Sequence, residues 1–381
     1  MSIFPENRVP GITERIGMDK QKKTVVVGMS GGVDSSVCAY LLKQQGYQVI
    51  GVTMQIWQDE SEERLENEGG CCGITAVDDA RRVAAVLDIP YYVMNFQKEF
   101  REKVIRYFDE AYLHGDTPNP CIACNRYVKW ESLLEKSMAI GADYIATGHY
   151  ARIRQLPNGR LAIENSRTAE KDQTYVLYNL TQEQLSRTLL PIGEYTKPEV
   201  RKIAEDAGLP VAHKHDSQEI CFVPDGDYAS FIEKDTGVRV PEGNFVTADG
   251  RVLGRHRGIT HYTVGQRRGL DLPMGHRVFV TGVRPETNEV VIGEDSDVWS
   301  RELTADHLNF MGIPGLAVGE SRHFLGKIRY NHRGDPCTVT RTGRDTIRCV
   351  FDRPVRAVTP GQALVLYEDD WVAGGGTIRR S

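Results

Sequence analysis

The chain has 381 residues, of which 40% are hydrophobic and 26% are charged, with 47 Lys and Arg against 52 Asp and Glu. This length indicates two or three domains, and the composition excludes collagen-like and long low-complexity chains. No apolar run approaches the roughly 18 residues of a membrane span, and the N-terminus lacks the apolar core of a secretory signal. We therefore expect a cytoplasmic protein whose eight cysteines serve catalysis or metal binding rather than a disulfide scaffold.

The first part of the chain alternates apolar strands with helical segments. Residues 24–29 form a β-branched run typical of a buried parallel strand, a helix is expected at 35–46, and the next strand at 47–55. Further helices are expected at 78–88, 98–115, 126–142 and 196–208, and further strands at 90–96 and 142–149. This alternation predicts an α/β doubly wound domain.

The pattern changes near residue 222. Apart from a short helical segment near 227–237, the remainder reads as short strands separated by Gly, Pro, Asn and Asp. Such strands are expected at 277–293, 326–331, 336–351 and 362–379. We predict a catalytic domain at 1–222 with an extension at 1–22, a small mixed or β central domain at 223–298, and an antiparallel β-barrel-like domain at 299–381.

The most informative local signal is the segment GMSGGVDSS at 28–36, between the first strand and the first helix. Backbone N–H groups of such a turn converge on an anion, and the helix dipole adds partial positive charge there. Gly31 and Gly32 allow close approach of a phosphate, and Asp34 is a candidate Mg²⁺ ligand. The spacing matches neither GxxxxGK[ST] nor GxGxxG. A plain Gly-rich turn is the alternative.

Two cysteines stand apart from the others. Cys124 lies in NPCIACN, where a turn meets a helix expected to begin near Arg126, and a thiol at a helix N-terminus has a lowered pKa. Cys221 lies about a hundred residues later in a polar, turn-rich context. Such a pair allows one cysteine to carry sulfur and the other to complete the exchange. Cys38, Cys337 and Cys349 lie in apolar patterns and are expected to be small buried hydrophobes.

These segments carry a resemblance to a known family. GMSGGVDSS resembles the PP-loop of the N-type ATP pyrophosphatases, which activate an oxygen by adenylation. TPNPCIACN, ATGHYAR, KDQTYVLYNL, HDSQEICFVP, YTVGQRRGL, GKIRYNH and PGQALVLY follow it in the order found in the bacterial tRNA 2-thiouridylases of the MnmA type. The resemblance covers nearly the whole chain from about residue 22.

The resemblance implies roles for individual residues. It implies that ATP is contacted by Gly28, Met29, Ser30, Gly31, Gly32, Val33, Asp34, Ser35, Met54 and Gly148. It implies that tRNA is contacted by Asn119, Pro120, Cys121, His149, Lys171, Asp172, Gln173, Arg329, Tyr330 and Gln362. By the same resemblance, Cys221 carries a persulfide, and Cys124 frees the sulfur by forming a transient disulfide with Cys221.

The implied reaction is ATP-dependent 2-thiolation of the wobble uridine of Lys, Glu and Gln tRNAs, with Mg²⁺–ATP as cosubstrate. A sulfur-relay protein or a cysteine desulfurase would supply the sulfur, and no membrane is involved. Cys121 occupies a position where many family members have Asp, and with Cys124 and Cys221 it could hold an iron–sulfur cluster. Cys71 and Cys72 add two more thiols in an acidic, Gly-rich segment.

Two other functions are compatible with parts of the sequence. A PP-loop amidotransferase or ligase of small molecules would explain SGGVDSS but would leave Cys124, Cys221 and the β region unused. An RNA-binding protein with a vestigial ATP site would release no AMP when tRNA, ATP and a sulfur donor are supplied together.

The net charge of −5 is unevenly distributed. Residues 1–222 carry the whole of it, and the remainder has 21 basic and 21 acidic residues. Within that remainder, 251–284 has seven Arg against one Asp, and 322–356 has nine Lys and Arg against three Asp. Solvated strand faces would explain single residues, but two arginine-rich stretches favour contact with the tRNA backbone.

Overall fold

A computed structural model describes residues 23–56, 74–215 and 220–380. The extension at 1–22 and the pair Cys71 and Cys72 lie outside these described residues. The chain divides into two compact units, each built from separate stretches of sequence. The first contains Met1–Phe96, Trp130–Thr174 and Thr181–Ser217, and the second contains Gln97–Lys129, Tyr175–Leu180 and Gln218–Ser381. None of the described helices has the length and apolar character needed to cross a membrane.

The first unit is built on a parallel sheet. Its strands are β1 (Thr24–Gly28), β2 (Gln48–Gln55), β3 (Tyr91–Asn95), β4 (Tyr144–Thr147) and β7 (Thr188–Leu189). Their order is β3-β2-β1-β4-β7, and every pairing is parallel. The direction of winding reverses between β1 and β4, which is where open α/β sheets bind ligands.

Helices and short turns complete this unit. They are α1 (Val33–Gln44), α2 (Ile74–Val86), α6 (Leu134–Ala139), α7 (Gln182–Ser186), η6 (Pro191–Glu194) and α8 (Lys197–Asp206). The core joins the fully buried Val25 and Val27 of β1 to the apolar face of α1. The helix start expected at Thr196 is confirmed, because Thr196 and Glu199 form a reciprocal capping box.

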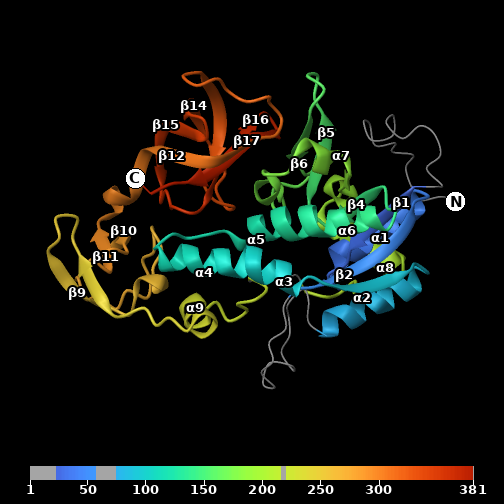
Figure 1. Cartoon of the computed structure of the whole chain (residues 1–381), viewed down its shortest axis with the longest axis horizontal. Helices are drawn as coiled ribbons and strands as arrows, with labels where there is room; N and C mark the ends of the chain where they lie inside the picture. The colour runs from blue at the N-terminus through green and yellow to red at the C-terminus, as the bar shows by residue number, and fades with distance from the viewer. Residues whose placement is uncertain (1–22, 57–73, 216–219, 381) are drawn as a thin grey trace. The chain divides into compact units, whose positions relative to one another are not determined.

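One hairpin of this unit was not expected from the sequence. β5 (Ala151–Gln155) and β6 (Leu161–Asn165) pair antiparallel and project as a green hairpin in Figure 1. The intervening segment LPNGR contains the turn residues Asn and Gly that such a connection favours. The hairpin lies between β4 and β7, where the strand–helix alternation of this part predicts a helix instead.

The second unit begins with two helical segments. The first runs through α3 (Gln97–Phe100), the π-helical η3 (Arg101–Ile105) and α4 (Arg106–Leu113). The second runs through α5 (Pro120–Ala123) into the π-helical η4 (Cys124–Leu133). The short η5 (Thr174–Leu177) and α9 (Tyr228–Thr236) follow, the latter confirming the isolated helix expected near 227–237.

A small mixed sheet follows α9. Its strands are β8 (Gly243–Val246), β9 (Val252–His256), β10 (Phe279–Arg284) and β11 (Glu289–Gly293), in the order β10-β11-β8-β9. Only the β11–β8 pairing is parallel. The short turns η7 (Ile259–His261) and η8 (Asp295–Val298) lie in the same region. Phe245, Val280 and Val290 are fully buried in the core of this domain.

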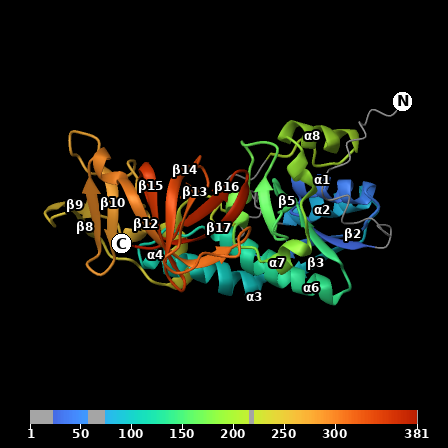
Figure 2. The same ribbon diagram turned by 90° about the horizontal axis from the view of Figure 1, so that it is seen from above.

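The last six strands close into an antiparallel barrel. They are β12 (Trp299–Phe310), β13 (Ser321–Lys327), β14 (Asp335–Gly343), β15 (Thr346–Arg356), β16 (Ala363–Glu368) and β17 (Trp371–Ile378). The order is β12-β15-β14-β13-β16-β17, and β17 returns to pair with β12. Figure 2 shows these strands, in orange to red, wrapped around one another. The long strand β12 was missed in the sequence because its inward apolar positions are interrupted by charged residues.

Candidate active site

The phosphate loop lies between β1 and α1 and is fixed by its own serines. The backbone N–H of Ser30 donates to Oγ of Ser35 at 3.1 Å, and Oγ of Ser36 donates to the carbonyl of Gly32 at 2.8 Å. Gly32 is the N-cap of α1, and no side chain caps the helix there. The first N–H groups of α1 are therefore available to an anion at this end of the helix.

Two glycines are required by close packing around this loop. Gly31 has φ of +68°, and a Cβ there would lie 2.3 Å from the carbonyl oxygen of Ala76. Gly148, directly after β4, would place a Cβ 2.6 Å from the backbone nitrogen of Ser35. The structure thus brings Gly148 against the first turn of α1, next to the residues that the sequence identified as the ATP site. Neither position has room for a side chain without movement of the backbone.

Asp34 is held by two side chains that the sequence analysis did not identify. Its Oδ1 accepts from the Tyr150 hydroxyl at 2.8 Å and from Nζ of Lys197 at 2.7 Å. Lys197 also donates to Oδ2 at 2.9 Å, and its side chain is only 11% exposed. The carboxylate therefore acts here as the acceptor of a largely enclosed ion pair. Lys197 lies in the first turn of α8, far from the loop in sequence.

A second lysine also reaches the loop. Nζ of Lys214 donates to the carbonyl of Gly31 at 3.2 Å and pairs with Asp79 at 2.7 Å. The loop itself contains no lysine, so its positive charges come from residues about 160 to 180 positions later. Neither lysine belongs to a sequence motif that predicts a role at this loop, so only the fold reveals them.

Met54 lies at the carboxyl end of β2, opposite Met94 of β3. Its neighbour Thr53 donates to the carbonyl of Met29 at 2.7 Å and accepts from the Tyr91 hydroxyl at 2.8 Å. These bonds tie the end of β2 to the start of the phosphate loop. Met54 therefore lies next to Thr53, the residue that makes both bonds.

The helix that carries Cys124 begins earlier than the sequence suggested. Asn119 is its N-cap, and Oδ1 of Asn119 accepts from the backbone N–H groups of Cys121 and Ile122 at 3.1 and 3.4 Å. The expected start near Arg126 was wrong, because Pro120 at the first helical position and the Asn119 cap open the helix six residues sooner. Cys121 lies in the first turn, and Cys124 follows one turn later, where its own N–H is bonded within the helix.

Cys124 also stands at a change of helical geometry. The α-helical turn α5 gives way to the π-helical η4 at Cys124 itself. Insertions of π geometry are uncommon and are often found at functional sites. Asn125, the next residue, is buried, and its side-chain amide donates to the carbonyl of Val176 at 2.9 Å. Cys124 is partly exposed and Cys121 is exposed.

Cys221 is placed by its neighbour Phe222. The ring of Phe222 is buried against Phe100 and Phe108, with centroids 5.6 and 5.2 Å apart. Phe100 and Phe108 belong to the helix α3–η3–α4, and α5 packs against η3 of the same helix. The segments that carry Cys124 and Cys221 are therefore both anchored to one helix, and both thiols are partly exposed.

The loop that precedes Asn119 is held by the C-terminal barrel. The N–H of Thr117 donates to the carbonyl of Pro360 at 2.8 Å, and Nε2 of Gln362 donates to the carbonyl of Thr117 at 2.8 Å. Arg380 adds an ion pair with Asp116 at 2.8 Å. Gln362, which the sequence predicts to contact tRNA, supports the entry to the cysteine helix in this structure.

The barrel also holds the segment that packs behind this helix. The buried hydroxyl of Tyr175 donates to the carbonyl of Ala363 at 2.8 Å. The Tyr330 ring, 40% exposed, lies edge-on to Tyr175 at 6.3 Å. Arg329 donates to the carbonyl of Arg356 at 2.7 Å, and burial together with the charge of Arg356 lowers the pKa of its guanidinium. Tyr330 and Arg329 therefore lie together on the second unit.

The remaining expected tRNA residues lie in the first unit. His149 is buried, with Nδ1 2.6 Å from the hydroxyl of Thr147 and its ring 5.6 Å from Trp130. Oδ2 of Asp172 accepts from the N–H of Ser166 at 2.8 Å. Oε1 of Gln173 accepts from the N–H of Tyr150 at 2.9 Å. These three side chains maintain local structure, and the partly exposed Lys171 is the cation of this segment.

The described residues do not form a metal centre. Among residues 23–56, 74–215 and 220–380, no three His, Cys, Asp or Glu side chains come together in a way that could hold a metal ion. Cys121, Cys124 and Cys221 are therefore not gathered into a group of three ligands among these residues.

Known protein families match this chain over nearly its whole length. A family described as the tRNA methyl transferase HUP domain matches residues 23–225, its PRC-barrel domain matches 229–294, and an aminomethyltransferase β-barrel domain matches 300–378. The tRNA-specific 2-thiouridylase MnmA of Lachnoclostridium phytofermentans is 64% identical over 93% of this chain and 99% of its own length. The chain belongs to the tRNA-specific 2-thiouridylase family.

A second relative supports the same conclusion. The tRNA-specific 2-thiouridylase MnmA of Clostridioides difficile is 53% identical over 94% of this chain and 99% of its own length. Membership of the 2-thiouridylase family confirms the resemblance found in the sequence motifs. It also confirms the expected architecture of an α/β domain followed by a small β domain and a closed C-terminal barrel.

Proposed function

We propose that this chain is an ATP-dependent tRNA uridine 2-sulfurtransferase that thiolates the wobble uridine of Lys, Glu and Gln tRNAs. The observation that carries the proposal is the common anchoring of the Cys124 and Cys221 segments on the helix α3–η3–α4. A ligase of small molecules has no use for two partly exposed thiols brought to one helix. Membership of the 2-thiouridylase family supports the same substrate class.

ATP provides the activation. The free N–H groups at the start of α1 and the nearby ammonium groups of Lys197 and Lys214 suit the triphosphate of Mg²⁺–ATP. The 2-oxygen of uridine attacks the α-phosphate, diphosphate leaves, and the adenylated oxygen becomes a good leaving group. Gly28, Met54 and Gly148 complete the proposed nucleotide site.

Sulfur transfer follows at the two cysteines. The terminal sulfur of a Cys221 persulfide attacks C2 of the activated uridine, and AMP leaves. The Cys124 thiolate then attacks the inner sulfur of Cys221, which releases 2-thiouridine and leaves a disulfide between the two cysteines. A thiol reductant restores both thiols. Holding the two sulfurs and the base together supplies several kcal/mol through effective molarity, on the order of 7 or more in favourable cases.

The proposed partners follow from this cycle. A sulfur-relay protein or a cysteine desulfurase charges Cys221, which lies beside the anchored Phe222 and is partly exposed. The target base must leave its stack to be modified, and Asn119, Pro120 and Cys121 at the start of α5 are the proposed base-binding segment. Lys171, Arg329 and Tyr330 are the proposed contacts to the rest of the RNA.

Cysteine variants test the sulfur step. Purified Cys124→Ser and Cys221→Ser enzymes should form no 2-thiouridine from unmodified tRNA, ATP and a sulfur donor, measured by nucleoside mass spectrometry. Cys38→Ala is the matched control, because Cys38 is fully buried on α1 and should leave the reaction nearly unchanged. Full thiolation of tRNA by both serine variants would contradict the proposed sulfurtransferase activity. Addition of a methyl group in place of sulfur would point to a different transferase.

A further inference from the structure

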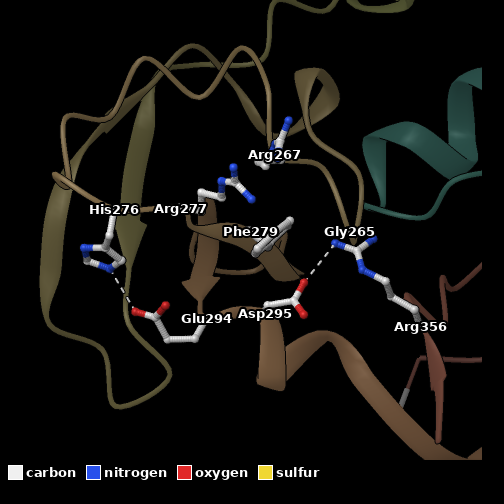
Figure 3. Close-up of a pocket in the computed structure, with 8 residues that line it drawn as sticks. All are labelled: Gly265, Arg267, His276, Arg277, Phe279, Glu294, Asp295 and Arg356. Atoms are coloured by element: carbon white, nitrogen blue, oxygen red, sulfur yellow. Dashed lines mark hydrogen bonds and ion pairs between the residues drawn. The ribbon is translucent and has the colours of Figure 1, made fainter.

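A cavity in the second unit is lined by residues that are distant in sequence from Cys124, Cys221 and the phosphate loop. It has a volume of about 780 Å³ and is lined by residues of β10, η8, the end of β15 and the loop 263–278. Figure 3 shows Arg277 and Phe279 near its centre, between the His276–Glu294 contact and the Asp295–Arg356 ion pair. The YTVGQRRGL motif supplies part of this lining, and neither the ATP step nor the sulfur step uses it.

Each acidic residue of the cavity has a partner among the residues that line it. Glu294 lies 2.8 Å from Nε2 of His276, and Asp295 lies 3.6 Å from the guanidinium of Arg356, as the dashed lines in Figure 3 show. Arg356 also lies over the ring of Phe279, 4.8 Å from its centroid. These contacts fix the walls of the cavity and leave its remaining charge to the other arginines.

Two arginines supply that charge. Arg267 and Arg277 line the cavity and are exposed, and neither side chain has a hydrogen bond or ion pair with any other residue that the structure describes. Arginine is suited to bidentate contact with phosphate oxygens. With Arg356, three guanidinium groups line the cavity against the two carboxylates of Glu294 and Asp295, so the lining has a net positive charge.

Backbone hydrogen bonds hold the loop that carries Arg267 in a defined conformation. The N–H of Gly265 donates to the carbonyl of Val280 at 2.8 Å, and the N–H of Val280 donates to the carbonyl of Gln266 at 2.9 Å. Gly265 has φ of +89°, and a Cβ there would lie 2.6 Å from Cβ of Ala357. The loop is thus seated against the end of β15, which reduces the entropy lost when the arginine beside it binds an anion.

We infer that Arg267 and Arg277 form a binding site for a backbone phosphate of tRNA. The inference rests on the proposed function, which makes tRNA the substrate. An extended polyanion fits better than a free phosphorylated metabolite, because both arginines are exposed and stand in the stretch 251–284, where seven Arg meet one Asp. Such a surface gives affinity that falls steeply with salt.

A pair of double variants tests the site. Arg267→Ala/Arg277→Ala removes both cavity arginines. Arg251→Ala/Arg257→Ala is the matched control, because it removes the same charge from two exposed arginines of the same stretch that do not line the cavity. Both pairs are exposed, so thermal melting should show the same folded state for each. The probe is an unmodified transcript of a Lys tRNA, with binding measured over a range of salt concentrations.

The cavity variant should bind this tRNA about 10- to 100-fold more weakly than wild type at roughly 0.1 M salt. The slope of log K against log salt should fall by about two, whereas the control should change much less. At saturating tRNA the cavity variant should keep the wild-type rate of thiolation, because it contacts neither cysteine segment. Equal losses of tRNA affinity in the two variants would show that tRNA responds only to the overall positive charge of this stretch. That result would contradict a specific phosphate site at Arg267 and Arg277.

Other outcomes separate this inference from the proposed function. Titration of the wild type with inorganic phosphate should show no saturable binding that competes with tRNA. Phosphate binding that depends on Arg267 and Arg277, together with unchanged tRNA affinity of the variant, would assign the cavity to a small phosphorylated molecule and refute the inference. Wild-type enzyme that binds tRNA but forms no 2-thiouridine would refute the proposed function and leave the phosphate site standing. Wild-type enzyme that binds no tRNA would refute both.

Discussion

At the scale of single residues, the charges around the phosphate loop come from outside it. Lys197 pairs with Asp34 at 2.7 Å and is largely enclosed, and Lys214 bonds to the carbonyl of Gly31. An ammonium group with little access to water interacts more strongly with an anion than one on the surface. Lys197 therefore both positions Asp34 and raises the positive potential where a triphosphate would bind.

Replacing Lys197 by Met tests this role. The variant should raise the KM for ATP by about tenfold or more, because a charged hydrogen-bond donor at the loop is lost. Lys197→Arg should restore part of the affinity. Lys202→Met is the control, since Lys202 lies on the same helix with its side chain 72% exposed. Equal KM values in Lys197→Met and wild type, measured by AMP release, would contradict the assignment.

A second residue-scale feature is the buried carboxyl group of Asp109. It lies on α4, its Oδ1 is buried without a hydrogen-bond partner among the described residues, and it is 3% exposed. Burial, with a hydrogen bond to Asp235 and the charge of Asp235, raises the pKa of Asp109 to about 8. Asp235 in turn pairs with Arg101 at 3.1 Å. The Asp235 carboxylate of α9 thus favours the protonated form of Asp109 on α4.

This raised pKa gives a pH dependence of stability. Because the folded-state pKa lies above the unfolded value, the stabilisation is complete below about pH 4 and is lost as the pH rises toward 8. Asp109→Asn should reduce the change of the free energy of unfolding with pH in this range. Above pH 8, its free energy of unfolding should exceed that of wild type by on the order of 2 kcal/mol. The exposed Glu102→Gln serves as control. If the free energy of unfolding in urea changes with pH equally for Asp109→Asn and wild type across this range, the raised pKa of Asp109 is refuted.

At the scale of elements, alternation and turn chemistry predicted most of the first unit. The strands at β1 and β2 and the capped start of α8 follow from β-branched runs and from the pair Thr196 and Glu199. The start of α5 was misplaced because the Asn119 cap and Pro120 were read as part of a turn. The hairpin β5–β6 lies where the strand–helix alternation of this part predicts a helix, and the inward apolar positions of β12 are interrupted by charged residues.

The candidate site was predictable only where a local motif carries it. SGGVDSS and the cysteine contexts revealed the loop, Cys124 and Cys221. Lys197 and Lys214 were not predictable, because their role depends on how distant segments of the first unit meet at the loop. Several residues expected to contact tRNA, such as Asp172, prove to hold backbone groups in place, a use that a motif does not distinguish from binding.

The packing of β4 against α1 makes a prediction at this scale. In Gly148→Ala, the new Cβ would meet the backbone of Asp34 and Ser35 at under 3 Å, so the first turn of α1 must move. We expect loss of ATP-dependent AMP release of at least about tenfold, with the fold retained. Gly343→Ala in the barrel is the control, because its Cβ would meet only ordinary contacts with Thr346. Wild-type AMP release by Gly148→Ala would show that this packing does not shape the nucleotide site.

At the scale of the whole molecule, charge and chemistry are divided along the chain. The net charge of −5 belongs to residues 1–222, while the arginine-rich stretches 251–284 and 322–356 follow it. The overall acidity therefore does not exclude a nucleic acid partner. In the barrel, Gln362 and Arg380 hold the loop that leads into the cysteine helix. The same barrel carries the arginine-rich stretch 322–356.

The most direct test of the account is the stoichiometry of a single turnover. Enzyme with a persulfide on Cys221 is mixed with ATP and unmodified tRNA, and AMP and 2-thiouridine are quantified in the same samples. We predict one AMP for each 2-thiouridine, with a disulfide between Cys124 and Cys221 appearing at the same rate. Formation of 2-thiouridine without AMP, or release of AMP with no sulfur entering the tRNA, would contradict it.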